Sequence, residues 1–566
     1  MHNFDNRRKM TRWYNPLLLA KTGFRAAIST TIGHITDNRK IHAALYPDIV
    51  VFDHSKDSPP EEDFWLDYVA DLGDGWESTY AVAAAICVQH QPAGAASTHR
   101  GSILIMGGDE VYPDPSLKAY CDQTIAPWNA AATDQESFET VLYALPGNHD
   151  WYDGLQAFSD VFCSQGRPCP GFPVGRFDNL YPRQTRSYFA LKLRQGWWMF
   201  GIDIQLNERI DSTQLAFFEN VSHQINPGDQ IILCAPTPSW VRETNGYKNA
   251  TALLASIGEL LTATGGKLRL ILAGDIHHYA RYESADRETD KGDLTLITAG
   301  GGGAFMHPTH VLPSNAAISW QHKDRQIFTK EKCYPPTRTS QNLTYKNLLF
   351  LFYNLEFAAT LGGIYMLLIW LLEARNGNGT EPLSRMFETM LASHISVAGT
   401  LVRFFQTIPK SPEFALLVII FSGALVAFNQ TPNPKSRVLL GLAHSFAHFT
   451  ALVIIYCAAI AFVMLLPVAL QGGIVGFGIF LLTMLVLGTV IGGTIFGLFL
   501  LFSLNVLHIQ WTNAFSSLRI KNYKNFLRLK FAPDGTLTVF AFGIDNVPED
   551  STAHLIERVT IPRKDS

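Results

Sequence analysis

Hydrophobic positions in the first 340 residues form short runs that end in glycine, aspartate or proline. Each run holds between four and eight residues, mostly apolar or β-branched, and helical stretches separate the runs. Runs of this length and composition are typical of buried strands in an α/β sheet. The runs are Trp65–Val69, Ser102–Met106, Val141–Ala144, Trp197–Ile202, Gln230–Cys234, Leu268–Leu272 and Leu294–Thr298. This part of the chain is therefore predicted to be an α/β domain.

The pattern changes near Leu348, where apolar residues begin to form much longer tracts. The hydrocarbon core of a bilayer requires about 20 apolar residues per helix. The tracts are Leu348–Leu372, Phe414–Phe428, Val438–Leu470 and Gly473–Leu507. We expect an α-helical transmembrane domain of four helices. Five helices are also compatible, because the last tract is long enough for a kink or a re-entrant turn.

These patterns divide the chain into four parts. Residues 1–45 are expected to form an amphipathic helical segment, and residues 46–340 the α/β domain. Residues 345–507 are expected to form the transmembrane region, and residues 508–566 a C-terminal cytoplasmic tail. Within that tail two apolar runs flank Pro533-Asp534-Gly535, which is the pattern of a β-hairpin.

The N-terminus and the basic residues indicate which side of the membrane the α/β domain occupies. The apolar stretch Leu17–Ala20 is too short for a secretion signal, so the domain is expected in the cytoplasm of a multi-pass cell-membrane protein. Lys435, Arg437 and the basic tail fall on that same side if there are four helices. The basic residues of the stretch 373–413 would then face outward, which counts against this orientation.

Charge and cysteine content exclude some functional classes. The 45 basic and 49 acidic side chains give a formal charge of −4, so we expect no nucleic-acid partner. The seven cysteines form no CxxC pair, so neither a zinc ribbon nor a thioredoxin-like redox site is indicated. Cys163 and Cys169 are close enough in sequence to pair, but we expect two reduced thiols.

Four predicted strands are followed at once by a tight turn that carries oxygen or nitrogen donors. The turns are Asp71-Leu72-Gly73-Asp74, Gly108-Asp109-Glu110-Val111-Tyr112, Gly147-Asn148-His149-Asp150 and Gly274-Asp275-Ile276-His277. Ligands bind at the carboxyl ends of strands in open α/β sheets, so these donors are expected to lie together. A pair of metal ions that activates water against a phosphoester needs carboxylates, amide oxygens and imidazoles. The four turns supply all of these.

In order and spacing, the turns resemble the calcineurin-like metallophosphoesterase superfamily over residues 60 to 310, in the motif variants of purple acid phosphatases. The resemblance implies a β-sandwich flanked by helices and two divalent metal ions, with Mn²⁺, Fe and Zn²⁺ as the expected elements. It implies that Asp109 bridges the two metals. Asp71 and His277 would hold the first metal, either alone or together with Tyr112.

The same resemblance assigns the second metal and the catalytic pair. Asn148 and Asp275 would hold the second metal. His149 would lie near the leaving-group oxygen as a proton donor or charge stabiliser, and Asp150 would orient its ring.

Two positions depart from the family pattern. Asp275 stands where the last motif of the family has its first histidine. The strand Gln230–Cys234 is followed by no imidazole, although the family has a strand-end histidine there. His278, His307 and His310 are the candidates to replace it.

Two other features are given simpler interpretations. Gly300–Gly303 is not followed by the Gly-Lys-Ser/Thr of a Walker motif, so we expect a tight turn near the site. His444 and His448 share one helix face, and we expect hydrogen bonding between helices or at the interface in preference to a metal or haem site.

Two functions are compatible with these residues. The first is a hydrolase that cleaves a phosphomonoester, phosphodiester or pyrophosphate bond at the membrane, where a lipid-linked phosphate is a suitable substrate because tethering raises local concentration. The second is a membrane sensor or transport component whose metallophosphoesterase-like head binds a ligand with little or no turnover. The missing histidine and Asp275 keep the second interpretation open.

Overall fold

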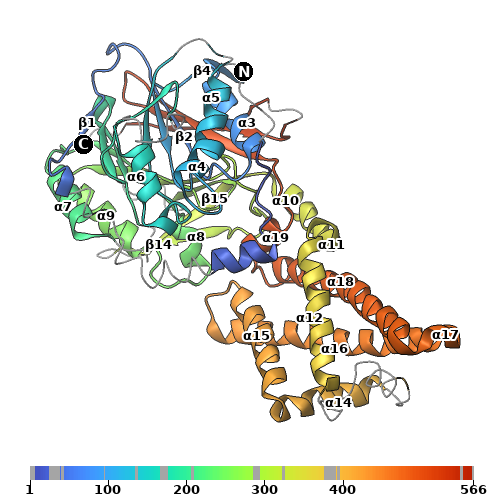
Figure 1. The fold of residues 1–566 in the computed structure, drawn as a ribbon. Coiled ribbons are helices and arrows are strands. Elements are labelled where there is room, and N and C mark those ends of the chain that lie inside the picture. The colour runs from blue at the N-terminus through green and yellow to red at the C-terminus, as the bar shows by residue number, and fades with distance from the viewer. Residues whose placement is uncertain are drawn as a thin grey trace. The chain divides into compact units, whose positions relative to one another are not determined.

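The computed structural model describes residues 7–23, 39, 44–94, 96–133, 135, 138–165, 176–204, 210–284, 293–320, 325–374, 391, 396–548 and 552–563. The chain divides into two compact units (Figure 1). The sheet unit comprises Met1–Thr11, Lys21–Gln341 and Arg519–Ser566. The helical unit comprises Arg12–Ala20 and Asn342–Leu518.

A seven-stranded sheet forms one layer of the sheet unit, in the order β18-β17-β16-β2-β5-β6-β7. Strands β2, β5, β6 and β7 are parallel to one another, and β16, β17 and β18 continue the sheet in antiparallel fashion. The strands are β2 (Phe64–Val69), β5 (Ile103–Met106), β6 (Thr140–Ala144), β7 (Leu180–Pro182), β16 (Lys524–Phe531), β17 (Leu537–Ile544) and β18 (His554–Ile561).

A nine-stranded sheet forms the second layer, in the order β1-β8-β9-β10-β11-β13-β12-β15-β14. Its centre, from β9 to β13, is parallel, and β12, β14 and β15 are antiparallel. The strands are β1 (Phe52–Asp53), β8 (Phe189–Lys192), β9 (Trp197–Gly201), β10 (Gln230–Ala235), β11 (Lys267–Ala273), β12 (Tyr279–Ser284), β13 (Thr295–Ala299), β14 (Asn315–Ile318) and β15 (Gln326–Tyr334). A separate two-stranded sheet joins β3 (His90–Ala93) and β4 (Ala96–His99).

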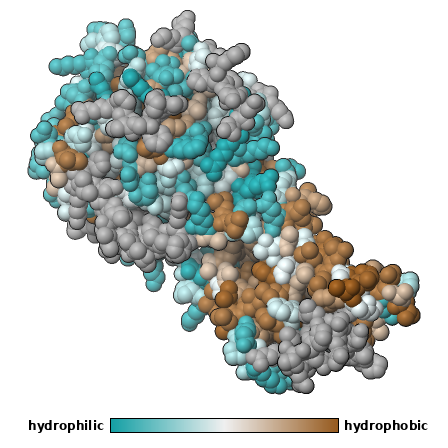
Figure 2. Space-filling view, in the orientation of Figure 1, coloured by the Kyte–Doolittle hydropathy of each residue, from teal (hydrophilic) through white to brown (hydrophobic). Residues whose placement is uncertain are grey.

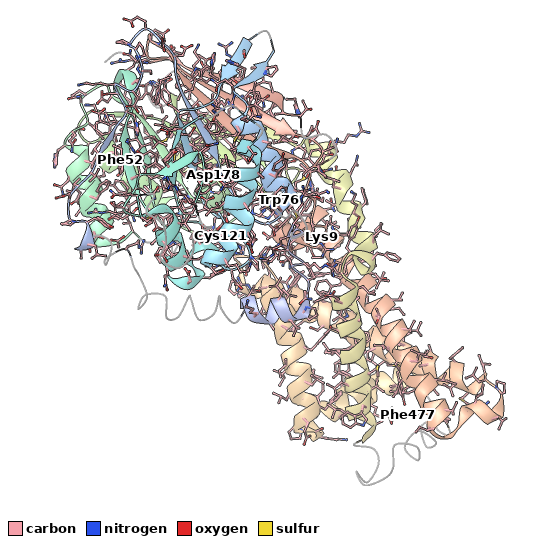
Figure 3. All side chains as sticks on the ribbon, turned by 45° about the horizontal axis from the view of Figure 1, so that its top comes forward. Lys9, Phe52, Trp76, Cys121, Asp178 and Phe477 are labelled. Carbon is pink, nitrogen blue, oxygen red and sulfur yellow. The ribbon has the colours of Figure 1, made fainter. Side chains whose placement is uncertain are left out.

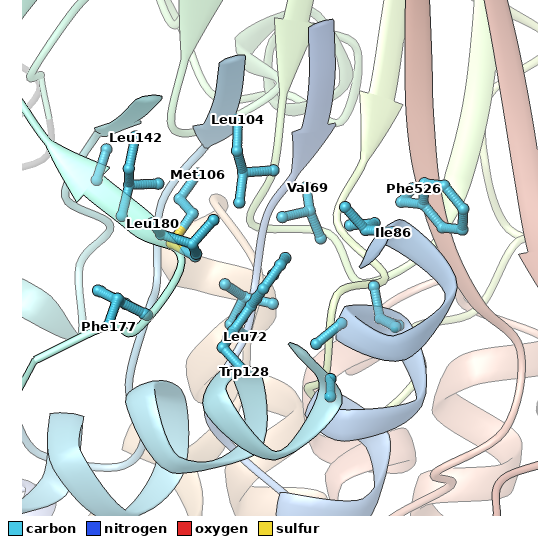
Figure 4. Packing of buried hydrophobic residues seen from close by; sticks show 14 of the residues in the cluster. Val69, Leu72, Ile86, Leu104, Met106, Trp128, Leu142, Phe177, Leu180 and Phe526 are labelled. Carbon is cyan, nitrogen blue, oxygen red and sulfur yellow. The ribbon is translucent and has the colours of Figure 1, made fainter. Parts of the chain in front are cut away.

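Alternation along the strands builds two hydrophobic cores. In β2, Leu66 and Tyr68 pack in the core that both sheets share, whereas Trp65 and Val69 pack in a second core with the helices. The second core brings strand residues together with α3 (Trp76–Cys87), α5 (Ala126–Thr133) and α6 (Gln156–Phe162) (Figure 4). Strands buried on both faces explain why the apolar runs are continuous in sequence.

The sheet unit is thus the α/β sandwich flanked by helices that the sequence predicts. Further helices are α7 (Ser212–Ser222), α8 (Ser239–Thr244) and α9 (Ala252–Thr262), of which α9 packs on β10 and β11. Cys163 is a buried free thiol. Its suggested partner Cys169 and residues 24–38 of the expected N-terminal helix lie outside the described residues, and a helix covers residues 16–23.

The C-terminal segment differs from the predicted separate tail. The expected hairpin is present as β16 and β17, but β16 also pairs with β2 near the start of the chain. Arg528 in β16 is fully buried, and its Nε lies 3.1 Å from Oδ1 of Asp67 in β2. The guanidinium also donates to the carbonyl oxygens of Ile86 and Val88. Residues 519–566 therefore belong to the sheet unit.

The helical unit contains three helices that are long and apolar enough to cross a membrane: Leu355–Glu373 in α12, Pro434–Met464 (α16) and Gly473–Asn505 (α18). A fourth apolar segment is a bent pair, Val397–Lys410 and Pro412–Phe428, with 107° between its parts. The count is therefore three, or four if the bent pair is one span, among the described residues. Hydrophobic side chains cover much of the visible surface of this unit (Figure 2).

Small residues and polar pairs hold these helices together. A Cβ on Gly488 of α18 would lie 3.0 Å from Cα of Gly362 in α12, so the two backbones approach closely. Tyr365 of α12 hydrogen-bonds Nδ1 of His448 at 2.6 Å, and the Nε2 atoms of His448 and His444 are 3.1 Å apart. An interhelical hydrogen bond is thus present at His448, whereas the printed contact of His444 with His448 lies within α16.

Candidate metal centre

The ends of four strands bring the predicted ligands to one edge of the sheet unit. Asp71 follows β2, Asp109 follows β5 and Asn148 follows β6, and these three strands are parallel neighbours. Asp275 and His277 follow β11 of the other sheet. The two edges meet here, because the backbone N–H of Asp275 donates to Oδ2 of Asp71 at 2.9 Å.

Three of these acidic residues have left-handed backbone conformations. The φ angles are 61° at Asp71, 55° at Asp109 and 67° at Asp275. Positive φ is uncommon for residues other than glycine, and strained positions of this kind concentrate at functional sites. Each strand therefore ends in a sharp turn that fixes the direction of its carboxylate.

The phenol of Tyr112 is the meeting point of the first ligand group. Its hydroxyl oxygen lies 3.2 Å from Oδ1 of Asp71 and 3.1 Å from Oδ2 of Asp109. Nε2 of His277 lies 3.1 Å from the same oxygen. Nδ1 of His277 contacts the carbonyl oxygen of Phe305 at 2.6 Å, which directs Nε2 toward the phenol. All four side chains of this group are buried.

The second ligand group is more open. Asn148 and Asp275 are half-buried. The side-chain amide of Asn148 donates to the hydroxyl of Tyr152 at 3.3 Å. Oδ2 of Asp275 accepts a hydrogen bond from the hydroxyl of Thr237 at 2.9 Å. Asp109 connects the two groups, because its Oδ1 accepts the backbone N–H of residue 149 at 2.8 Å while Oδ2 faces the phenol.

His149 and Asp150 have separate roles in this geometry. Nδ1 of His149 lies 2.9 Å from the carbonyl oxygen of Pro113, an acceptor that assigns the proton to Nδ1 and leaves Nε2 as the basic nitrogen. The carboxylate of Asp150 accepts from the backbone N–H of Gly147 at 2.7 Å and from the hydroxyl of Tyr120. The described hydrogen bonds of Asp150 therefore stabilise the turn, and that of the His149 ring is with Pro113; the orientation of the ring by Asp150 stays a prediction.

The carboxylates are crowded in a buried space. Burial, followed by the charge of Asp275, raises the pKa of Asp109 to about 7. Burial and the neighbouring carboxylates raise the pKa of Asp71 well above its usual value. Burial lowers the pKa of His277, which keeps its imidazole neutral and able to act as a ligand. Such a cluster of desolvated carboxylates is stabilised by a bound cation.

The donor set fits a metal ion at the first group. Two carboxylates, a neutral imidazole and a phenol are ligands that transition metals accept. Among the described residues, His, Cys, Asp and Glu side chains alone form no group of three with metal-binding geometry. Tyr112 adds the fourth donor of the first group, and its hydroxyl lies within 3.2 Å of Asp71, Asp109 and His277.

Glycines allow the turns to approach so closely. A Cβ on Gly147 would lie 2.0 Å from Oδ1 of Asp109, and one on Gly300 would lie 2.3 Å from Oδ2 of Asp71. A Cβ on Gly301 would lie 2.0 Å from Nδ2 of Asn525 in β16. The glycine tract is therefore a tight turn against the site, as its sequence suggests.

The described contacts of the three candidate replacement histidines are with residues outside the second group. The ring of His307 stacks on that of His277, with centroids 4.1 Å apart. Nδ1 of His310 contacts the hydroxyl of Ser340 at 2.9 Å. His278 is fully buried, and its backbone N–H donates to the carbonyl oxygen of Ile276. None of their described contacts is with Asn148 or Asp275.

Two residues near the centre are not predicted from the sequence. Thr237 lies just beyond β10, at the strand end that lacks the histidine, and its only sequence signal is that position. Lys524 lies in β16, far outside the motif region, and its Nζ donates to the carbonyl oxygen of Ala304. Burial lowers the pKa of Lys524 to about 7, although Asp74 and Asp71 act in the opposite direction.

Comparison with known proteins identifies the domain. The model of the calcineurin-like phosphoesterase family matches residues 64–279. No curated protein matches the chain. A solved structure, "GAP50 the anchor in the inner membrane complex of Plasmodium", matches with 12% identity and a TM-score of 0.32, covering 47% of this chain and 78% of its own. That score describes a weak likeness. The family match spans all four ligand-bearing turns, so residues 64–279 form a calcineurin-like phosphoesterase domain.

Proposed function

We propose that this protein is a membrane-anchored, metal-dependent phosphoesterase that hydrolyses a phosphomonoester, phosphodiester or pyrophosphate bond. Calcineurin-like phosphoesterases are usually metal-dependent hydrolases. The observation that carries the proposal is the convergence of Asp71, Asp109 and His277 on the hydroxyl of Tyr112. Structural turns alone would not require four donors from two sheets to meet at one buried point.

Each side chain then has a defined task. Asp71, His277 and Tyr112 would hold the first cation together with Asp109, and Asp109, Asn148 and Asp275 would hold the second. Bound cations at these positions supply an activated water and stabilise charge on phosphoryl oxygens.

His149 acts on the leaving group. Its Nδ1 is held by the carbonyl of Pro113, so Nε2 is the atom available to exchange a proton with the leaving-group oxygen. Asp150 positions this ring indirectly, by fixing the turn that carries it.

The membrane part supports anchoring with the phosphoesterase domain on one defined side. Strand β16, which follows the helical unit in sequence, pairs with β2, which precedes it. Both flanking segments must therefore lie on the same side, which requires an even number of crossings. Three long helices would give an odd number, so we propose that the bent pair is a fourth crossing.

Contacts within the helical unit agree with this count. In the bent pair, α14 (Val397–Thr407) lies beside the C-terminal ends of two helices, with Arg403 paired to Glu373 of α12 and Thr400 beside Cys457 of α16. The second part, α15 (Pro412–Phe428), packs along α16, where the ring centroids of Phe421 and Phe449 are 5.5 Å apart. We propose that α14 lies along the far surface of the membrane and that α15 crosses back. The basic residues near Lys435 and in the tail favour a cytoplasmic phosphoesterase domain.

The test of the proposal is turnover by the full-length protein. Protein purified in detergent is stripped with a chelator, reloaded with Mn²⁺ and assayed with p-nitrophenyl phosphate and bis-p-nitrophenyl phosphate. We expect hydrolysis of at least one substrate, loss of it in Asp109→Asn, and a decrease in kcat of about 10²–10⁴-fold in His149→Ala. Asp178→Asn changes an exposed carboxylate and serves as the matched control (Figure 3). Turnover that survives Asp109→Asn overturns the proposal.

A second candidate function is a membrane sensor or transport component that binds a ligand without hydrolysis. The observation that favours it is the second ligand group, which contains no imidazole among the described residues. Folded, metal-loaded protein that hydrolyses neither substrate would support this function instead.

For the hydrolase, a lipid-linked phosphate is the proposed substrate class, because it suits an anchored enzyme.

A further inference from the structure

A groove lies between two of the long apolar helices, α12 and α18, and encloses a cavity of about 350 Å³. The two helices are antiparallel, and small residues let their backbones approach closely over part of their length: Gly488 faces Gly362, and Gly493 faces Ala358. Beyond Gly488, the residues of α18 that line the cavity are large, namely Met484, Leu481, Phe480 and Phe477 (Figure 3). The groove therefore opens where the close contact at the glycines ends.

The groove is apolar along its length and open on one side. Phe480 and Met484 are buried at its base. Leu367 and Trp370 of α12 also line it, and these side chains are 39% and 48% exposed. The groove is therefore accessible from the side of the helical unit. Around a helix that crosses a membrane, that side faces lipid hydrocarbon and not water.

One end of the groove is polar. Glu373, near the C-terminal end of α12, lines the groove and is buried. Its carboxylate pairs with the guanidinium of Arg403 in α14 and accepts a hydrogen bond from the hydroxyl of Tyr456 in α16 at 3.1 Å. The side chain of Arg403 is 34% exposed. Because a guanidinium carries five N–H donors in a planar fork, Arg403 is suited to bind a phosphate while Glu373 holds it in place.

The position of Trp370 indicates the depth of this polar end in a membrane. Trp370 lies three residues before Glu373, and tryptophan is enriched where the hydrocarbon meets the headgroups. The segment Leu355–Glu373 has 19 residues, which is about 28 Å of helix and close to the thickness of the hydrocarbon core. The polar end therefore lies at headgroup depth, at the end of α12 opposite the one that follows the sheet unit in sequence.

We propose that this groove binds one acyl chain of a membrane phospholipid and that Arg403 binds the phosphate of the same lipid. The apolar cavity accommodates the chain, and the partly exposed cation at its end complements the phosphate. The proposal rests on the proposed membrane anchoring and does not depend on hydrolysis. The lipid is a resident component and not a substrate, because its headgroup lies at the end of α12 away from the sheet unit in sequence.

Native mass spectrometry of the full-length protein tests the proposal. Protein purified in detergent and washed free of lipid is titrated with dioleoylphosphatidylglycerol, or with dioleoylglycerol, which has the same chains and no phosphate. We expect one phospholipid per chain to bind in a saturable step, and dioleoylglycerol to bind at least about 10-fold more weakly. Phospholipid that adds progressively without saturation, or equal binding of the two lipids, overturns the proposal.

Gly363→Leu tests the position of the chain. Gly363 lines the groove, and a Cβ at this position would meet no atom of another helix within 4 Å. We expect this variant to bind the phospholipid at least about 10-fold more weakly, because the new side chain occupies the space of several methylene groups. Unchanged binding in Gly363→Leu would place the lipid elsewhere and overturn the proposal.

Gly423→Leu is the matched control for this variant. Gly423 is an exposed glycine of α15 whose Cβ would also meet no atom of another helix within 4 Å. The described residues that line the groove belong to α12 and α18. Gly423→Leu should therefore bind the phospholipid as wild type does, and equal weakening in both glycine variants would contradict a site in the groove.

Arg403→Gln tests the position of the phosphate. We expect the preference for phospholipid over dioleoylglycerol to disappear, while the binding of dioleoylglycerol stays unchanged. A preference that persists in the folded variant overturns the role of Arg403. The circular dichroism spectrum and Tm of each variant are compared with wild type. If Arg403→Gln is not folded, the comparison of the two lipids on wild type and Gly363→Leu decides the question.

Failure of this proposal can be distinguished from failure of the proposed anchoring. Protein that alkaline carbonate releases from membranes would overturn both. Protein that stays in the membrane and binds the phospholipid equally well in wild type and Gly363→Leu would overturn the lipid site alone. Hydrolysis of phosphate esters enters neither outcome.

Discussion

At the scale of single residues, Tyr112 connects the proposed ligands of the first metal position. Its hydroxyl contacts Asp71, Asp109 and His277, and its ring lies 4.4 Å from that of His149. The residue thus links the proposed first metal position with the proposed proton donor. A packing role alone would not place the hydroxyl among three donor atoms.

Tyr112→Phe isolates the contribution of this hydroxyl. We expect the affinity of the first metal position for Mn²⁺ to fall by about 10–100-fold, because one donor is lost while the ring still fills its space. Calorimetric titration of the stripped protein measures this change. Unaltered affinity in a folded Tyr112→Phe variant would show that the phenol only packs.

Residues of the centre differ in how far sequence predicts them. Asp71, Asp109 and His277 follow apolar runs inside recognisable turns, so local pattern is sufficient to find them. The contact of Thr237 with Asp275 depends on the pairing of β10 with β11, which is a property of the folded sheet. Lys524 lies near the centre in β16, a strand that follows the helical unit in sequence. No local sequence pattern predicts this position.

Among the elements, β16 is held to β2 by a buried ion pair as well as by the strand ladder. Arg528 and Asp67 are both nearly inaccessible to solvent, and the guanidinium reaches two backbone carbonyls as well. Removing one partner of such a pair leaves an uncompensated buried charge.

Arg528→Ala tests this link. We expect the free energy of unfolding of the sheet unit to fall by about 3–5 kcal/mol, measured by chemical denaturation of the full-length protein. Lys530→Ala on the same strand is the control, because Lys530 pairs with Asp63 near the surface and should cost less than about 1 kcal/mol. Equal losses in the two variants would contradict the structural role of the buried pair.

Sequence predicts the elements better than their partners. The apolar runs correspond to β2, β5, β6, β9, β10, β11 and β13, and the tail hairpin corresponds to β16 and β17. The pairing of β16 with β2 joins residues more than 450 positions apart, such as Leu529 and Leu66, and alternation within a strand carries no information about such partners. The second apolar tract, Phe414–Phe428, lies in α15, and a bend of 107° separates the two parts of the pair.

At the scale of the whole molecule, the shared sheet constrains the membrane topology. Residues before and after the helical unit form one fold, so a helical unit that crosses a membrane would do so an even number of times. This constraint does not depend on counting basic residues in the loops.

Side-specific labelling measures the topology. Single cysteines are placed at Asp178 in the phosphoesterase domain and at Asp534 in the β16–β17 turn, in a chain whose native cysteines are replaced. In sealed membrane vesicles, we expect an impermeant maleimide to label both positions or neither. Labelling of only one position in intact vesicles would require an odd number of crossings and contradict the pairing of β16 with β2.

The most direct measurement of the central claim is anomalous X-ray scattering from crystals of the full-length protein grown with Mn²⁺. The account predicts a peak within about 2.5 Å of donor atoms from Asp71, Asp109, Tyr112 and His277. A folded structure with these four side chains in place and no anomalous peak between them would contradict it.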